Sequence, residues 1–127
     1  MIKATSKVII NAGMIKKISQ AQVRALEQTA EALHTEIVQA QVMPRDTGTL
    51  QNEKTFVDNS DAQRGISRII SEGPYARRLY FHPEYNFQTA ENPNAKGRWF
   101  EDWLPGGKEE DFAPDAFKRF YKKEAGI

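Results

Sequence analysis

The longest hydrophobic pattern in the chain lies in residues 13–42. Its apolar side chains recur at steps of three and four, the spacing of one face of an α-helix; they are Ile15, Ile18, Leu26, Ala30, Leu33, Ile37 and Ala40. Gln22 is the one polar break in this stripe, and Pro44 prevents the helix from continuing. Such a helix would be roughly 40 to 45 Å long, about 1.5 times the width of so small a domain. We therefore expect either that part of the stripe packs on a partner subunit or that the helix bends or frays near its start.

Shorter patterns follow Pro44. Residues 55–58, 66–71 and 76–81 are rich in β-branched, aromatic or alternating apolar positions and are separated by turn residues, so they predict an antiparallel meander. Residues 112–123 predict a second, shorter helix. We expect an α+β fold in which a long N-terminal amphipathic helix packs on a small antiparallel β-sheet, with a short C-terminal helix.

The C-terminal helix carries its own start and stop signals. Pro114 suits the first helical position, and Gly126 suits the position just past the end. Helical spacing places Phe117, Phe120 and Tyr121 on one face, which we expect to be buried.

Length, charge and composition narrow the class of protein. The 127 residues leave room for one domain, spanning residues 1–127, with a modest core. A formal charge of +1 is too small to hold nucleic acid over the whole surface, so any DNA contact must come from a local patch. The chain has no cysteine, which fits a protein of a reducing cytoplasm. The short apolar run at residues 8–10 is far below a signal peptide or membrane span, and we expect no membrane association.

Asp46-Thr47-Gly48 is the tripeptide of the pepsin-like and retroviral aspartic proteases. Those enzymes need an apolar strand before the Asp and a second carboxylate that shares its proton. Here Pro44 and Arg45 precede Asp46, and a neighbouring guanidinium would keep the carboxyl ionised. A turn at the end of the first helix, in which Asp46 or Thr47 caps amides and Gly48 takes a positive φ, is the favoured interpretation. A small dimeric aspartic protease that uses Asp46 stays an alternative.

Other chemical candidates are few. His34 and His82 are the two histidines, and each lacks the neighbours of a metal site. No glycine pattern typical of phosphate binding is present, so we expect no metal, no cofactor and no catalytic residue. Basic residues cluster near aromatic ones; they are Arg77, Arg78, Lys118, Arg119, Lys122 and Lys123. A nucleic-acid-binding module is therefore a further alternative.

Three motifs follow the order found in the minor capsid and head–tail connector proteins of tailed bacteriophages. Residues 44–50 carry a P-x-D-T-G-x-L segment that ends at Leu50, Tyr75-Ala76 enters a later predicted strand, and residues 112–117 open the last helix. The chain resembles this family. It departs from the broader connector pattern after Tyr80, and its aromatic segment 86–103 looks closer to the minor capsid proteins of phages of Gram-positive hosts.

The resemblance implies a structural virion protein without enzymatic activity. It implies a homo-oligomeric ring at the head–tail junction of the virion, assembled in the host cytoplasm, with portal or adaptor proteins and tail proteins as partners. The genome passes through such a ring, and we expect non-specific DNA contacts at Arg77, Arg78, Lys118, Lys122 and Lys123.

Large aromatic side chains are the expected anchors between neighbouring subunits, because they dominate interface energetics. The candidates are Tyr75, Tyr85, Phe87, Trp99, Phe100 and Trp103. For Trp99, Phe100 and Trp103 the alternative is equally open that they cover the protein's own sheet.

Overall fold

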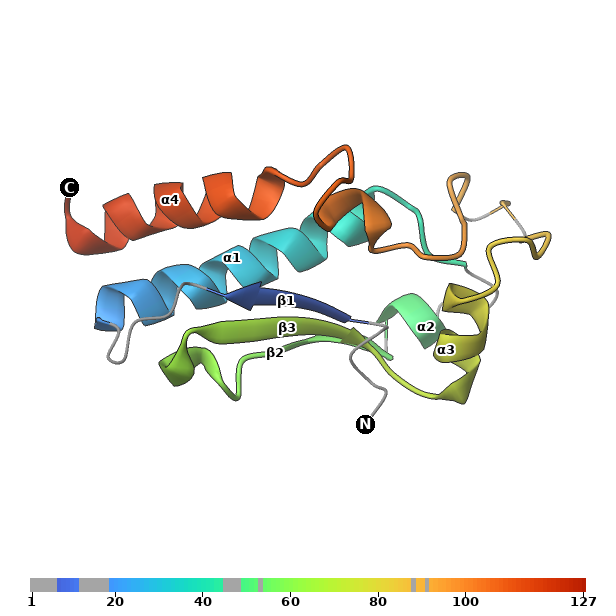
Figure 1. Cartoon of the computed structure of the whole chain (residues 1–127), viewed down its shortest axis with the longest axis horizontal. Coiled ribbons are helices and arrows are strands. Elements are labelled where there is room, and N and C mark those ends of the chain that lie inside the picture. Colours follow the sequence, from blue (N-terminus) through green and yellow to red (C-terminus); the bar gives the residue numbers. More distant parts are fainter. Residues whose placement is uncertain (1–6, 12–18, 45–48, 53, 88, 91) are drawn as a thin grey trace.

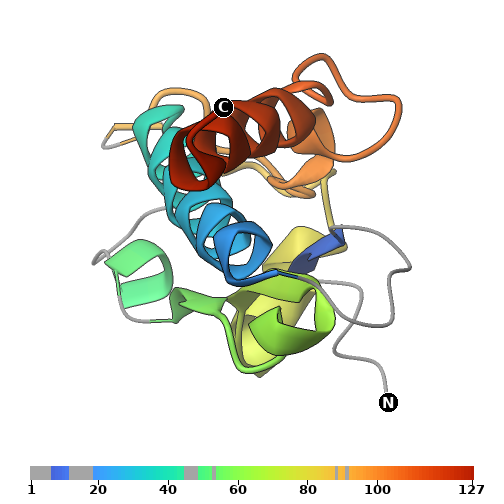
Figure 2. The same ribbon diagram turned by 90° about the vertical axis from the view of Figure 1, so that its left-hand side faces the viewer.

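A computed structural model describes residues 7–11, 19–44, 49–52, 54–87, 89–90 and 92–127. The regular elements follow one another as β1 (Lys7–Asn11), α1 (Gln20–Gln39), α2 (Thr49–Asn52), β2 (Thr55–Asp58), η2 (Ala62–Arg64), β3 (Ile66–Ser71), α3 (Pro74–Tyr80), η3 (Glu101–Trp103) and α4 (Phe112–Ala125). Helix α4 packs on α1, and α1 packs on the sheet, so the elements form three layers with α1 in the middle (Figures 1 and 2). The α+β fold predicted from the sequence is confirmed.

Helix α1 is shorter than its hydrophobic stripe. It begins after Ser19, whose backbone is extended and whose hydroxyl accepts a hydrogen bond from the amide of Gln22 (3.1 Å). The Gln22 side chain in turn accepts one from the amide of Ser19 (2.8 Å), which completes a capping box. The predicted start at residue 13 is therefore wrong, and Gln22, the break in the stripe, is a capping residue.

Three antiparallel strands form the sheet, in the order β1-β3-β2. The predicted strands 55–58 and 66–71 are confirmed as β2 and β3. The strand predicted for residues 76–81 is wrong, because this segment belongs to helix α3. Pro74 takes the first turn of α3 after Gly73 at φ 102°, and the following Ala, Arg and Leu residues favour a helix. The third strand is β1, which the sequence pattern did not predict.

The core lies between α1 and its neighbours. Val23, Leu26, Leu33 and Ile37 of α1 are buried, as is Ile69 of β3. Residues outside the long helices and the strands complete it, and the largest of these are Met43, Trp99, Phe100 and, in η3, Trp103. The hydrophobic stripe of α1 is thus used within the protein along the described helix, from Val23 to Ile37.

Helix α4 runs antiparallel to α1 (Figure 1). It ends at Gly126, which takes the left-handed conformation at φ 74°, as predicted. It begins at Phe112, so the predicted place of Pro114 at the first helical position is wrong by two residues. Phe117, Phe120 and Tyr121 are only half-buried, and Ala116 is the buried residue of the helix.

Candidate interaction surfaces

The three-stranded sheet has one covered and one open face. The side chains of β3 alternate in burial: Ser67, Ile69 and Ser71 are buried toward α1, and Ile66, Arg68 and Ile70 are only half-buried on the other side. No described helix or strand lies over that second side, as the end-on view shows (Figure 2).

Neighbouring strands extend this open side. Residues directly opposite one another in a sheet point to the same face, and the register pairs Phe56 with Ile70 and Ile9 with Arg68. Ile9 is 48% exposed. We call Ile9, Phe56, Ile66, Arg68 and Ile70 the outer face of the sheet. Its four apolar side chains lie outside the buried core.

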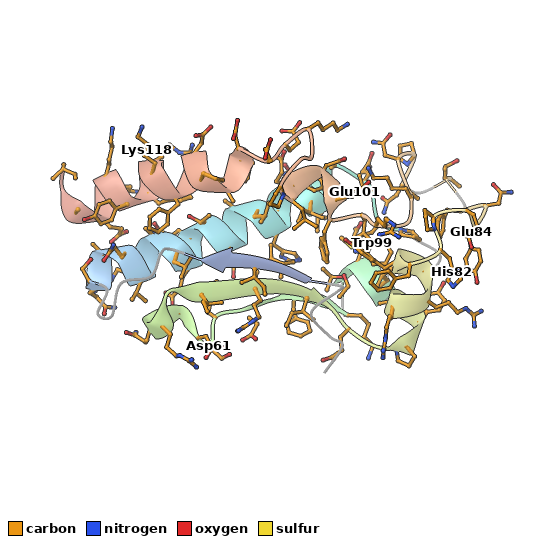
Figure 3. All side chains as sticks on the ribbon, in the orientation of Figure 1. Asp61, His82, Glu84, Trp99, Glu101 and Lys118 are labelled. Carbon is orange, nitrogen blue, oxygen red and sulfur yellow. The ribbon has the colours of Figure 1, made fainter. Side chains whose placement is uncertain are left out.

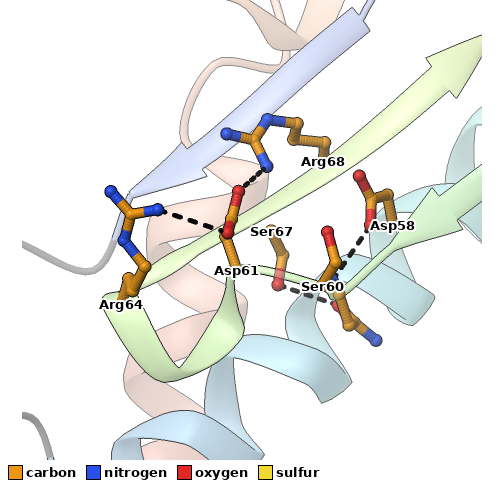
Figure 4. Close-up of polar contacts among 7 residues, drawn as sticks. Asp58, Ser60, Asp61, Arg64, Ser67 and Arg68 are labelled. Atoms are coloured by element: carbon orange, nitrogen blue, oxygen red, sulfur yellow. Dashed lines mark hydrogen bonds and ion pairs between the residues drawn. The ribbon is translucent and has the colours of Figure 1, made fainter.

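The charge on the outer face is neutralised locally. The guanidinium of Arg68 donates to the carboxylate of Asp61 at 2.6 Å, and Arg64 pairs with the same carboxylate at 3.5 Å (Figure 4). In the turn between β2 and β3 the backbone amide of Ser60 donates to the Asp58 carboxylate at 2.9 Å, and the hydroxyl of Ser67 in β3 donates to the side-chain oxygen of Asn59 at 2.8 Å. Arg68 is thus held in an ion pair. The register also pairs Lys7 with Ile70, Asn11 with Ile66 and Asp58 with Arg68, so apolar and polar positions alternate across this side of the sheet.

A polar network closes the opposite, inner face. The hydroxyls of Thr55 and Ser71 are hydrogen-bonded at 2.8 Å, and the indole N–H of Trp99 donates to Ser71 at 3.2 Å. All three residues are buried. Because each polar group has a partner, these side chains can line a dry layer under α1.

Trp99, Phe100 and Trp103 are core residues, and their interpretation as subunit anchors is wrong. Trp99 and Phe100 are 0% exposed and Trp103 is 6% exposed. Trp99 packs edge-on against Tyr80, with ring centroids 4.9 Å apart. The alternative, that they cover the protein's own interior, is the observed one. Sequence alone left both interpretations, subunit anchor and core residue, open because large aromatic side chains suit both a core and an interface.

Tyr80 lies at the centre of this aromatic cluster. Burial, reinforced by the nearby Glu101 carboxylate, raises the pKa of Tyr80 to about 12, against the opposing effects of Arg98 and the Phe100 amide. The neutral phenol is therefore the form that the fold accommodates.

The remaining aromatic candidates, Tyr75, Tyr85 and Phe87, lie at the end of the molecule formed by α3 and the following loop. Tyr75 is 60% exposed and Tyr85 is 39% exposed, whereas Phe87 is half-buried. The ring of His82 stacks on Tyr85 with centroids 4.6 Å apart and contacts Glu84 at 2.7 Å (Figure 3). This hydrogen bond from His82 lowers the pKa of the Glu84 carboxyl. Tyr75 and Tyr85 are thus available to a partner.

The predicted basic residues do not form one surface. Arg77 and Arg78 are exposed on α3, and Lys118, Lys122 and Lys123 are exposed on α4. Helix α3 and the C-terminal half of α4 lie at opposite ends of the molecule (Figure 1). The structure therefore divides them into two separate groups.

The turn motif lies mostly outside the described residues. Asp46, Thr47 and Gly48 are among those that the structure does not describe, so the protease alternative stays a prediction. Leu50 is 5% exposed in the core, in helix α2. In the described part of the chain, no three His, Cys, Asp or Glu side chains are placed to hold a metal ion.

In comparisons with known proteins, no family model, no curated protein and no solved structure matches the chain. None of the described helices combines the length and the apolar character that crossing a bilayer requires.

Proposed function

We propose that this chain is a structural subunit of a tailed-phage particle, a member of the connector ring that joins the portal to the tail. The observation that carries the proposal is the outer face of the sheet. Ile66 and Ile70 lie on it, while two serines occupy the buried side of the same strand. Four apolar side chains lie outside the core on this side, with Ile9 exposed and Phe56, Ile66 and Ile70 half-buried, and no described helix packs over them. Such a sheet face is typical of a protein that buries it against a neighbour.

The kind of contact follows from the shape of the subunit. The outer face and the α4 layer lie on opposite sides of the protein (Figure 2). A patch that contacts a different patch on the next copy gives a head-to-tail contact, which closes into a ring when the rotation between copies is right. The phage connector, rather than another kind of ring, is supported by the sequence resemblance. Its Tyr75-Ala76 motif lies in the first turn of α3, where Tyr75 is exposed and Ala76 is buried.

Electron microscopy of lysates from a phage that lacks this gene tests the proposal. We expect filled heads beside unattached tails. Normal, joined particles in the absence of the gene product would overturn it.

A matched pair of variants tests the outer face in the same assay. Ile66→Asn combined with Ile70→Asn places polar groups on the outer face, and we expect this variant to fold but not to restore joined particles. Ile127→Asn changes an isoleucine that is 81% exposed at the end of the chain, away from the sheet, and should restore them fully. Full restoration by both variants would remove the outer face from the assembly contact.

A further inference from the structure

Strand β1 forms one edge of the sheet. It pairs with β3, and in the part of the chain that the structure describes no strand pairs with its other side (Figure 1). An edge strand presents unpaired backbone N–H and C=O groups, which can bind a strand of another chain. The register of the sheet determines which residues of β1 present these groups.

One backbone hydrogen bond shows which neighbour each residue of β3 faces. The amide of Glu72 donates to the carbonyl of Lys54 at 2.8 Å, which extends the register of β2 and β3 by one residue. Hydrogen-bonded and non-hydrogen-bonded pairs alternate along an antiparallel ladder. The backbone groups of Glu72 point to β2. Those of Ser67 and Ile69, which lie an odd number of residues before Glu72, therefore point to β1.

The same alternation continues across β1. The register places Ile10 and Val8 opposite these two residues of β3, so the backbone groups of Ile10 and Val8 point to β3. Ile9, between them, is 48% exposed. The N–H and C=O groups that point away from the sheet belong to the alternate residues of the strand, which are Lys7, Ile9 and Asn11.

The sequence of β1 does not protect this edge. Natural edge strands are commonly protected by a proline or by a charge within the strand. The 5 residues of β1 contain no proline, and their one charge is at the first position, Lys7. The opposite edge, β2, is less accessible, because it has 4 residues, ends in the charged Asp58 and contains Thr55, which is 3% exposed. A further strand can therefore pair more readily with β1.

A second copy of β1 fits this edge. When two copies run antiparallel across a twofold axis at Ile9, this residue lies opposite the partner's Ile9, and Lys7 lies opposite the partner's Asn11. Residues with outward backbone groups are then paired with one another, and each pair exchanges two hydrogen bonds. No lysine lies opposite a lysine, so the contact has no like-charge pair. We propose that two copies of the chain associate through β1 and form one continuous antiparallel sheet.

This contact is small, and it leaves the outer face open. Two paired edges of 5 residues lie at the low end of protein interfaces, below about 1,200 Å², where complexes are weak and exchange with free chains. A twofold axis perpendicular to the sheet keeps the outer faces of both copies on the same side of the joined sheet. The dimer is thus compatible with the proposed use of the outer face. It is a property of the free chain and does not depend on the role in the particle.

Disulfide cross-linking tests the pairing. The chain has no cysteine, so a single introduced cysteine can form a disulfide only with another copy. Opposite Cα atoms of a hydrogen-bonded antiparallel pair are about 5.5 Å apart, within the range that a disulfide spans. In a glutathione redox buffer, Ile9→Cys should form a covalent dimer at least about tenfold faster than Tyr75→Cys, because pairing raises the effective concentration of the thiols. Tyr75 is the more exposed of the two side chains, so exposure alone predicts the opposite order.

A mixture of two variants tests the register. In Lys7→Cys alone, or in Asn11→Cys alone, the two cysteines of a dimer are offset by about 13 Å along the strands, too far for a disulfide. An equal mixture of the two variants should form the mixed covalent dimer. Self-linking of Lys7→Cys as fast as linking in the mixture would show parallel pairing and overturn the proposal.

Sedimentation velocity at micromolar concentrations tests the association without a covalent bond. Ile9→Pro removes an N–H that points away from β3, so the ladder between β1 and β3 keeps its hydrogen bonds. Loss of two hydrogen bonds, one from each copy, should weaken the dimer by roughly 30-fold. Val57→Pro is the matched control, because Val57 lies opposite Ile69 and its N–H points outward at the β2 edge. Circular dichroism checks the fold of both variants, and Ile9→Lys, which sets two like charges opposite each other, replaces Ile9→Pro if that variant does not fold.

Three further outcomes would overturn the proposal: a wild-type chain that sediments as a monomer throughout, cross-linking of Ile9→Cys no faster than that of Tyr75→Cys, or equal effects of the two proline variants. None of them alters the assembly result from the lysates, so failure here and failure of the proposed function are distinguishable.

Discussion

The two faces of β3 can be compared residue by residue. Toward α1 the strand presents Ser67, Ile69 and Ser71, and away from it Ile66, Arg68 and Ile70. The more apolar face is thus the less buried one. Hydroxyls can be buried here because each is hydrogen-bonded, Ser67 to Asn59 and Ser71 to Thr55 and Trp99. Burial in β3 therefore follows from what covers each face and from satisfied polar groups. The hydrophobicity of β3 alone would assign its two faces the other way round.

The largest loss of stability should come from a substitution on the inner side of the sheet. Trp99→Ala removes a fully buried ring that packs on Tyr80 and donates to Ser71. We expect the free energy of unfolding to fall by about 3–5 kcal/mol, as for other buried Trp or Phe truncations. Urea denaturation measures this loss, and Tyr75→Ala, at a side chain 60% exposed, is the control, with a change within about 0.5 kcal/mol. Unchanged stability together with lost assembly would restore the interpretation of Trp99 as a subunit anchor.

Adjacent isoleucines give the most direct comparison of the faces. Ile69→Ala leaves a cavity under α1 and should cost about 2–5 kcal/mol. Ile70→Ala makes the same chemical change on the outer face and should cost only about 1 kcal/mol in the isolated chain. Both are measured by urea denaturation. Equal losses would mean that the outer face is as well covered as the inner one, which would contradict its role as a contact surface.

The sequence predicted the elements whose pattern and local signals agree. Helix α4, with its stop at Gly126, and the strands β2 and β3 were found from periodicity and turns. The start of α1 was missed because its hydrophobic stripe continues on the N-terminal side of Ser19. Only the side chains of Ser19 and Gln22 together mark where the helix begins. Segment 76–81 was misassigned because Pro74 after Gly73 was interpreted as a turn, although the same pair can begin a helix.

The candidate surfaces were harder to predict than the elements. The periodicity of β3 indicates two faces but not which of them α1 covers, since that choice is made by tertiary packing. The same holds for Trp99 and Phe100, whose composition suits both a core and an interface. The exposed lysines of α4 were predictable, because helical spacing places them opposite Phe117 and Tyr121.

A single hydroxyl tests the polar part of the inner face. Ser71→Ala removes the acceptor of the Trp99 indole N–H, which leaves this buried donor unsatisfied. Thr55 loses one partner but keeps its hydrogen bond to the Leu50 carbonyl at 2.8 Å. We expect a loss of about 1–3 kcal/mol in the free energy of unfolding. Thermal and urea denaturation measure it, with Ser60→Ala, in the exposed turn, as the control. A neutral Ser71→Ala would mean that small size, and not hydrogen bonding, explains the serine in the core.

The smallest effect should come from a polar contact that is fully open to water. His82 donates to Glu84 at 2.7 Å and lowers the pKa of its carboxyl, so the charged carboxylate is favoured in the folded chain. Any stabilisation from this contact is present above the ordinary pKa of a glutamate and is lost as the pH falls through the lowered value. Carbon-detected NMR should show Glu84 titrating below 4.5, and His82→Asn should return it toward that value. Because solvent screens an exposed pair, we expect Glu84→Gln to leave the melting temperature unchanged at neutral pH. A clear drop in melting temperature would show that an exposed contact at the α3 end stabilises this fold as the buried network around Ser71 does.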